Sequence, residues 1–250
     1  MNRAYTTTVP LVLLRHAQSA WNLENRFTGW ADVGLTETGR AEARRAGALL
    51  HAHGYRFDRA FVSRLRRSTE TLQIVLHELG QECLPVERSW RLNERHYGAL
   101  EGLDKAAYAA THGAPRLERV RRGLYERPPP LAPDDPRYLR HRDAYPDLDP
   151  ALLPATESLA DTAARLWPYW EATIAPAAAR GERVLVVSHG NTLRALAMRL
   201  ENMSERDVER FEIPTAVPLV FEFAPDGARR RYYIEDTAGA RSILAVKQQP

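Results

Sequence analysis

The sequence predicts an α/β fold: a three-layer α/β/α sandwich with a mostly parallel sheet and a cap insertion. Short continuous apolar runs, typical of strands buried on both faces, alternate with segments of helical period. The pattern changes at about 104–156, where eight prolines fall between Pro128 and Pro154. We interpret this stretch as a cap inserted into a single domain of residues 1–250.

The first half of the chain is expected to supply three strands and two helices. The strands are Val9–Leu14, Arg59–Val62 and, more weakly, Leu84–Glu87, and the helices are 36–53 and about 67–79. Thr36 is a suitable N-cap for the first helix, and Gly54 and Gly80 follow the two helices as end signals.

The second half repeats the alternation after the cap. A helix at about 157–178, kinked at Pro168, precedes the strand Arg183–Ser188, the helix Thr192–Leu200 and strands at about 217–223 and 230–235. Within the cap, the triplet Pro128–Pro130 is more typical of a stiff turn than of a ligand for a proline-binding module.

Composition excludes several classes of protein. With 44% hydrophobic residues, 27% charged residues and a net charge of +3, the 250-residue chain is neither disordered, fibrous nor a disulfide scaffold. Its basic residues are arginine except for Lys105 and Lys247, and they are scattered, which indicates compositional bias rather than a nucleic-acid site. The apolar run Val9–Leu14 is too short for a signal peptide or a membrane span, so a cytoplasmic protein is expected. Cys83 is interpreted as a small buried hydrophobe rather than a reactive thiol.

Two histidines follow two of the expected buried strands. His16 follows the first strand after one residue, Arg15, and His189 comes directly after Ser188. If these strands are neighbours in a parallel sheet, both imidazoles lie at one sheet edge. A lone histidine is usually structural, whereas this pair favours a functional site.

The residues around this pair suit phosphoryl transfer. Neutral imidazole is a good nucleophile near pH 7, and phosphoryl oxygens need cations nearby. Arg15 precedes His16, Arg67 follows the strand ending at Val62 with Arg64 and Arg66, and a helix begins near Thr192 at the same edge. Glu94 could exchange a proton with a substrate hydroxyl, although a single glutamate in a loop is usually solvated.

Several longer motifs resemble one family. They are Arg15-His-Ala-Gln-Ser19, Trp21-Asn22, Glu24-Asn-Arg-Phe-Thr-Gly-Trp30, Leu92-Asn-Glu-Arg-His-Tyr-Gly-Ala-Leu100, Arg121-Arg122 and His189-Gly-Asn-Thr-Leu-Arg-Ala195. Together they resemble the cofactor-dependent phosphoglycerate mutases of the histidine phosphatase superfamily, over residues 9–235. The first motif alone would indicate only the superfamily.

The resemblance implies a role for each matching residue. His16 would be the nucleophile, Arg15, Arg67 and His189 would stabilise the phosphoryl group, and Glu94 would be the general acid and base. The implied substrate contacts are Arg15, Ser19, Asn22, Thr28, Gly29, Arg67, Glu94, Arg95, Tyr97, Lys105, Arg121, Arg122, Gly190 and Asn191.

The implied reaction interconverts 3-phosphoglycerate and 2-phosphoglycerate, in glycolysis and gluconeogenesis, with 2,3-bisphosphoglycerate as the primer and no metal. Small phosphoglycerates are the expected partners, without nucleic acid or membrane, and a homodimer or homotetramer is expected. The alternatives are a histidine phosphatase acting on another small phosphoester and a non-catalytic paralogue that binds phosphometabolites.

Three departures from the family pattern bear on these expectations. The family usually has Gly and Glu where this chain has Ala17 and Gln18, and a positive φ at position 17 would cost roughly 1 kcal/mol. The match fades after Asp236, and loss of a covering tail could admit water and raise phosphatase activity. Ser19 is retained, which favours the mutase over the branch that makes bisphosphoglycerate.

Overall fold

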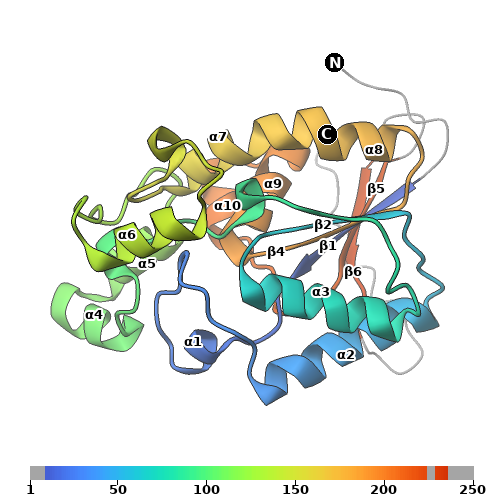
Figure 1. Ribbon diagram of the computed structural model, residues 1–250, viewed down its shortest axis with the longest axis horizontal. Helices are drawn as coiled ribbons and strands as arrows, with labels where there is room; N and C mark the ends of the chain where they lie inside the picture. Colours follow the sequence, from blue (N-terminus) through green and yellow to red (C-terminus); the bar gives the residue numbers. More distant parts are fainter. Residues whose placement is uncertain (1–8, 224–228, 236–250) are drawn as a thin grey trace.

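The computed structural model describes residues 9–223 and 229–235, and these form a six-stranded sheet (Figure 1). Its strands are β1 (Val9–Arg15), β2 (Arg59–Val62), β3 (Val86–Arg88), β4 (Val184–Ser188), β5 (Leu219–Phe223) and β6 (Arg229–Tyr233). The order is β3-β2-β4-β1-β5-β6, with parallel pairing from β3 to β1 and antiparallel pairing at β5 and β6. The expected α/β fold with a mostly parallel sheet is therefore confirmed.

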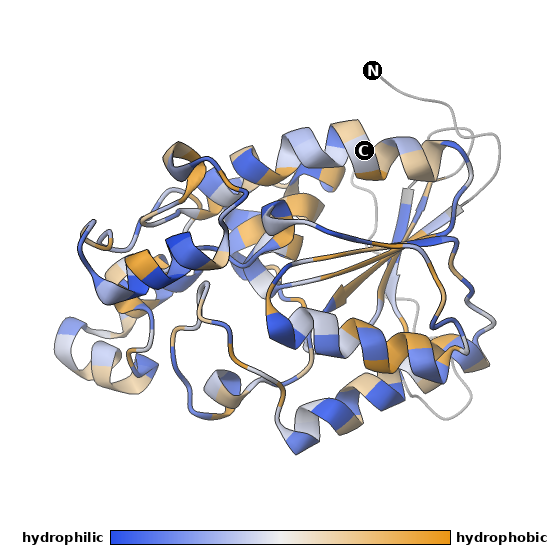
Figure 2. Cartoon of the chain, viewed as in Figure 1, coloured by the Kyte–Doolittle hydropathy of each residue, from blue (hydrophilic) through white to orange (hydrophobic). Residues whose placement is uncertain are grey.

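Helices cover both faces of the sheet (Figure 1). One face carries α2 (Glu37–Ala52) and α3 (Arg66–Glu78), and the other carries α7 (Leu159–Tyr169), α8 (Ala175–Ala179) and α9 (Gly190–Glu201). Because side chains alternate along a strand, Val12 of β1 packs in the α2–α3 core while Leu13 packs in the α7–α9 core. Figure 2 shows the central strands as largely hydrophobic, as burial on both faces requires.

The cap lies at one end of the sandwich (Figure 1). It contains α4 (Lys105–His112), α5 (Ala114–Arg122), α6 (Pro136–Ala144) and a 3-10 turn at Pro150–Leu152. The proline triplet is ordered within it, since the Pro129 carbonyl accepts a 2.8 Å hydrogen bond from the Ala99 N–H. The cap's helices were not predicted: α6 lies among the prolines, and α4 and α5 precede them but are only eight and nine residues long.

Shorter elements connect these layers. They are α1 (Ala20–Leu23), α10 (Glu205–Arg210), and 3-10 turns at Trp90–Leu92 and Gly98–Leu100. At the expected kink, the chain stays helical past Pro168 and passes through a π-helical segment, Trp170–Ile174, into α8. A proline removes one backbone donor, and a π segment re-pairs the backbone that follows.

Several expectations need correction. Cys83 is exposed, so its interpretation as a buried hydrophobe is wrong: it lies in a turn, and the strand begins only at Val86. Helix α9 begins at Gly190 rather than Thr192, so its first turn starts directly after His189. Ala17 is not among the described residues with positive φ, so the backbone cost considered for it does not arise. The chain after Asp236 lies outside the described residues.

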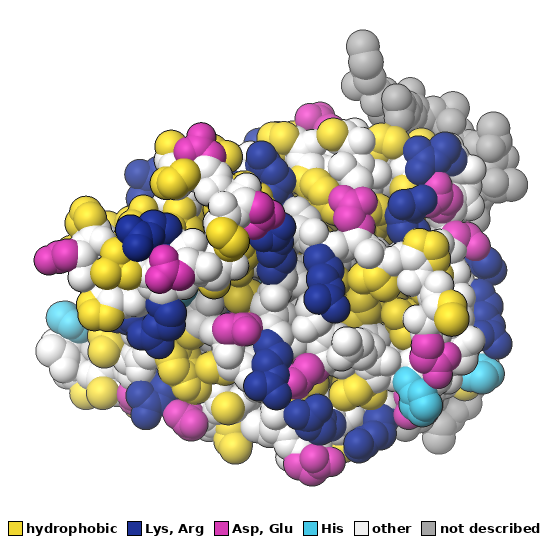
Figure 3. Space-filling model, viewed as in Figure 1, with side chains coloured by type: hydrophobic (Ala, Val, Ile, Leu, Met, Phe, Trp, Pro, Cys, Tyr) yellow, Lys and Arg dark blue, Asp and Glu magenta, His cyan; other side chains and the backbone are white. Residues whose placement is uncertain are grey.

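Charge on the surface is mixed rather than gathered. On the face shown in Figure 3, Lys and Arg lie interspersed with Asp and Glu, consistent with a compositional origin for most of the arginines. Across residues 9–223 and 229–235, no helix is both long and apolar enough to cross a lipid bilayer.

Candidate active site

His16 lies at the carboxyl end of β1, next to the end of β4. Arg15 pairs with Ser188 in the parallel register, and the His16 backbone N–H donates to the Ser188 carbonyl at 2.9 Å. The His16 Nδ1 lies 2.7 Å from the Ala17 carbonyl oxygen, which can only accept, so Nδ1 carries the proton. The lone pair of Nε2 is therefore the one available for attack.

Arg67 fixes the position of that Nε2. It is fully buried in the first turn of α3, and its Nε donates to the His16 Nε2 at 3.3 Å. Its other nitrogens donate to the carbonyls of Gly29 and Ala31, each at 2.9 Å. Burial lowers the pKa of Arg67 to about 10, so the guanidinium remains charged at neutral pH.

The neighbouring Arg64 and Arg66 instead form ion pairs near the protein surface. Arg64 pairs with Asp147, and Arg66 pairs with Glu70 at 2.5 Å. Only Arg67 of the three turns inward: Arg66 lies in the same first turn of α3, but successive residues of a helix point in different directions, and it is Arg67 that faces the end of β1.

His189 faces His16, with the ring centroids 4.9 Å apart. The His189 Nε2 lies 2.8 Å from the Ser63 hydroxyl and 3.1 Å from the Ser68 hydroxyl. The Ser63 oxygen already accepts from the Leu65 N–H, and its own proton is free to go to Nε2. The proton of His189 is thereby placed on Nδ1, which is buried and has no partner among the described residues.

The sequence reasoning missed both serines. Ser63 directly follows β2 and Ser68 lies in the first turn of α3, so only their place at the sheet edge could have indicated a role.

Both imidazoles are neutral at pH 7. Burial, followed by the charges of Arg67 and Arg15, places the pKa of His16 well below its ordinary value. Burial and then Arg67 do the same for the pKa of His189. A buried neutral imidazole among arginines is a competent nucleophile toward a phosphoryl group.

Unpartnered guanidinium nitrogens mark two further anion-binding positions. Arg15 donates from Nη1 to the Ile213 carbonyl at 2.9 Å, but its buried Nε has no partner in the described chain. Arg95 donates from Nη2 to the Val120 carbonyl at 2.6 Å, while its buried Nε and Nη1 are also unpartnered. Buried donors are rarely left unsatisfied, so this set fits an anionic ligand.

Gly190 lets Arg15 approach the start of α9. A Cβ there would lie 3.4 Å from the Arg15 Nε, and the first turn of α9 presents its N–H groups at this edge.

Glu94 lies beside these donors and is largely buried, contrary to the usual solvated state of a loop glutamate. Its Oε1 accepts from the backbone N–H of Arg95 at 2.8 Å and of Asn191 at 3.2 Å. Its Oε2 accepts no hydrogen bond from the described residues, which leaves that oxygen for a substrate proton. The Asn191 side chain donates to the Tyr97 hydroxyl at 3.3 Å, and the Arg95 guanidinium stacks over the Tyr97 ring.

Cap residues complete this side of the site. The Arg121 carbonyl accepts from Arg95 at 3.2 Å, and the charge of Arg121 contributes to lowering the pKa of Arg15 after burial. Arg122 pairs with Glu212. Lys105, at the start of α4, donates to the Arg26 carbonyl at 2.7 Å, and burial lowers its pKa.

The N-terminal loop residues mainly shape the backbone. Ser19 and Asn22 cap α1 reciprocally, with the Ser19 hydroxyl 3.0 Å from the Asn22 Oδ1. Gly29 has φ +54° and offers its carbonyl to Arg67, and the Thr28 carbonyl accepts from the Ala31 N–H. Between these four residues and the histidine rings, the described part of the chain has no direct side-chain hydrogen bond.

The fold and this site, with two buried neutral histidines beside arginines, are those of a phosphoryl-transfer enzyme. The chain belongs to the histidine phosphatase superfamily, branch 1, whose family model matches residues 11–144 and 131–235.

Solved structures of similar fold include hydrolases and a mutase. A mycobacterial glucosyl-3-phosphoglycerate phosphatase complexed with VO3 is 25% identical, with 85% of this chain and 92% of that chain covered and a TM-score of 0.64. A phosphoglycerate mutase from Bacillus anthracis str. Sterne is 22% identical, covering 93% and 95%, with a TM-score of 0.65. An alpha-ribazole phosphatase from Shigella flexneri is 21% identical, covering 92% and 98%, with a TM-score of 0.63.

Proposed function

We propose that the chain is a 2,3-bisphosphoglycerate-dependent phosphoglycerate mutase that works through a phosphohistidine at His16. The observation that carries the proposal is a second set of buried, unpartnered donors on Arg95, in addition to the free Nε of Arg15. A substrate with two anionic groups would satisfy both sets. The setting we propose is glycolysis and gluconeogenesis in the cytoplasm, in a homodimer or homotetramer.

In this proposal each group has one task. The His16 Nε2 attacks phosphorus as the bond from phosphorus to the substrate oxygen breaks, while Arg67 and the Nδ1–H of His189 stabilise the phosphoryl oxygens. Glu94 gives a proton to the departing oxygen and recovers one from the hydroxyl that is phosphorylated next. Arg95 holds the second anionic group of the substrate.

Bound 2,3-bisphosphoglycerate would supply the first phosphoryl group. The unpartnered donors fit it, since one belongs to Arg15, the residue before His16, and the others belong to Arg95, which also donates to the Val120 carbonyl of the cap. Arg121 and Arg122, at the end of α5, would add positive charge at its distal end.

An enolase-coupled assay with and without 2,3-bisphosphoglycerate tests the proposal. We expect 2-phosphoglycerate formation that depends on the bisphosphate, and one acid-labile phosphate per chain that His16→Ala abolishes. A stable serine ester, or label that persists in His16→Ala, would refute the histidine mechanism.

A histidine phosphatase on another small phosphoester is the second candidate. It is favoured by the similarity to a glucosyl-3-phosphoglycerate phosphatase at 25% identity. Release of inorganic phosphate from phosphoglycerates, without formation of the isomer, would support it over the mutase.

A further inference from the structure

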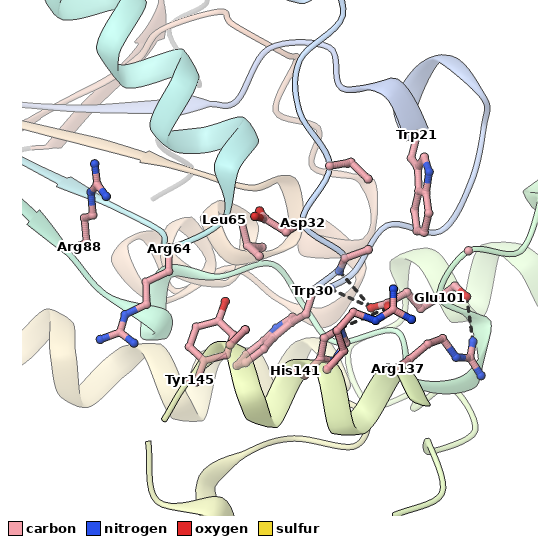
Figure 4. Close-up of a pocket in the computed structure, with 15 residues that line it drawn as sticks. Trp21, Trp30, Asp32, Arg64, Leu65, Arg88, Glu101, Arg137, His141 and Tyr145 are labelled. Atoms are coloured by element: carbon pink, nitrogen blue, oxygen red, sulfur yellow. Dashed lines mark hydrogen bonds and ion pairs between the residues drawn. The ribbon is translucent and has the colours of Figure 1, made fainter. Parts of the chain in front are cut away.

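Glu101 is a buried carboxylate that the sequence reasoning did not assign. It follows the 3-10 turn Gly98–Leu100 and lies at one end of a pocket of about 760 Å³ between the 30–33 loop and α6 (Figure 4). Its Oε2 accepts from the backbone N–H of Trp30 at 3.2 Å and of Ala31 at 3.1 Å. The carboxylate therefore fixes the backbone of this loop.

The same loop holds Arg67. The carbonyls of Gly29 and Ala31 accept from the two terminal nitrogens of Arg67, whose Nε reaches the His16 Nε2. Glu101 thus holds the backbone N–H groups of the segment 29–31, and the carbonyls of the same segment orient the Arg67 guanidinium beside His16. The contact is close, because a Cβ at Gly29 would lie 3.2 Å from the Glu101 Oε2.

The other oxygen of Glu101 faces the cap. Its Oε1 lies 3.3 Å from the Nε2 of His141 in α6, and the His141 Nδ1 lies 3.0 Å from the His96 Nε2. The Gly98 N–H donates to the His96 Nδ1 at 3.0 Å. Because that N–H can only donate, the His96 Nδ1 accepts and the His96 Nε2–H donates to the His141 Nδ1. The proton of His141 is then on Nε2, which lies 3.3 Å from the carboxylate oxygen.

These three residues also lie close enough to suggest metal ligands. A single ion would take one nitrogen from His141, yet the two His141 nitrogens face different partners, one on each side of the ring. Two hydrogen bonds and the His141–Glu101 contact give both imidazoles partners, so the arrangement is accounted for without an ion.

We propose that Glu101 is a positioning residue for phosphoryl transfer: through the backbone of residues 29–31 it sets Arg67 beside His16, and through His141 it ties that setting to the cap. The inference rests on the proposed transfer at His16, and it holds for a mutase and for a phosphatase alike.

Replacing the carboxylate separates its two tasks. Two carboxylate oxygens serve three donors, whereas an amide has one acceptor oxygen. In Glu101→Gln that oxygen goes to the two backbone N–H groups, and the amide NH2 then opposes the His141 Nε2–H. Arg67 stays in place while the contact with the cap is lost. Glu101→Ala loses both the backbone contact and the cap contact. If the alanine variant does not fold, Glu101→Met is used instead, because methionine has a similar volume and no carboxylate oxygen.

The experiment measures kcat and KM for p-nitrophenyl phosphate together with the 15N NMR signal of the His16 ring. We expect Glu101→Ala to lower kcat on the order of ten- to a hundredfold with little change in KM, as displacement of a catalytic group does. We expect Glu101→Gln to stay within about threefold of wild type, because it keeps the backbone end. The control is Glu126→Ala, which breaks a cap ion pair with Arg116 and should leave kcat and the His16 signal unchanged.

The outcomes separate the two proposals. If wild type neither hydrolyses the ester nor accepts phosphate on His16, the proposed function fails, and the His16 signal alone then decides the positioning role. A shift of that signal in Glu101→Ala but not in Glu126→Ala supports positioning. The inference is overturned if Glu101→Ala and Glu101→Met both leave the signal and kcat unchanged, or if Glu101→Ala raises KM alone. It is also overturned if Glu101→Gln is as impaired as Glu101→Ala.

Discussion

Removing the two serine hydroxyls beside His189 tests how that imidazole is held. Ser63 and Ser68 both lie within hydrogen-bond distance of its Nε2, at 2.8 Å and 3.1 Å. Either hydroxyl alone can donate to the single lone pair of the His189 Nε2, so one serine can keep this nitrogen hydrogen-bonded when the other is removed. We therefore expect strong non-additivity between Ser63→Ala and Ser68→Ala.

The magnitude follows from burial. With one hydroxyl left, Nε2 remains paired and transfer should slow by no more than about threefold, or about 0.7 kcal/mol. With both removed, a fully buried nitrogen loses its partner, which costs about 1–3 kcal/mol and corresponds to roughly 5- to 150-fold in rate. The proton is also no longer confined to Nδ1, the nitrogen that faces a ligand without any other partner.

The assay is the single-turnover rate of His16 phosphorylation in the two single variants and the double variant. Thr69→Ala is the matched control, since this hydroxyl lies on the same helix and bonds only to the Arg66 carbonyl. Additive single effects, or a double variant as fast as wild type, would refute the argument that the serines fix His189.

Three further predictions address the cap, the core and pH. Arg121→Ala should weaken the use of phosphoglycerate far more than hydrolysis of an aryl phosphate, measured as kcat/KM, and equal losses would argue against a cap clamp. Gly39→Ala should destabilise the fold by about 1–3 kcal/mol in urea unfolding despite better helix propensity, because its Cβ would lie 2.0 Å from the Gln18 carbonyl oxygen; a stabilised variant would contradict this. Stability should fall as the pH drops below about 6.5, by roughly 1 kcal/mol per buried histidine at pH 5.5, since the unfolded chain takes up protons that His16 and His189, with their lowered pKa values, refuse. A flat stability curve from pH 7.5 to 5.5 would show that these imidazoles titrate normally in the folded protein.

The sequence predicted the parts of the fold that have a period. The strand Val184–Ser188 is buried throughout and apolar up to its last residue, and the helix Glu37–Ala52 carries an apolar stripe and a polar cap, so the sequence pattern predicts both. The placement of His16 and His189 at strand ends also followed, because parallel neighbours bring their carboxyl ends together.

What the sequence did not indicate depends on contacts between distant residues. Ser63 meets His189 across 126 positions, and Glu101 meets the 30–31 backbone across about 70, with no local pattern to mark either. For the exposed Cys83, the apolar neighbour Leu84 suggested burial. The residue instead lies in a turn closed by a hydrogen bond from the Leu84 N–H to the Gln81 carbonyl, which leaves its side chain exposed.

The parallel pairing of β1 with β4 sets the positions of His16 and His189 independently of the cap. Both imidazoles are placed by one ladder of backbone hydrogen bonds, so their spacing depends on strand register and not on what covers them. The cap, by contrast, is a continuous insertion between β3 and α7 that supplies Arg121 and Arg122. In the proposed function, exchanging the cap would change the acceptor of the phosphoryl group while both imidazoles keep their places, which gives a route by which one scaffold serves both isomerases and hydrolases.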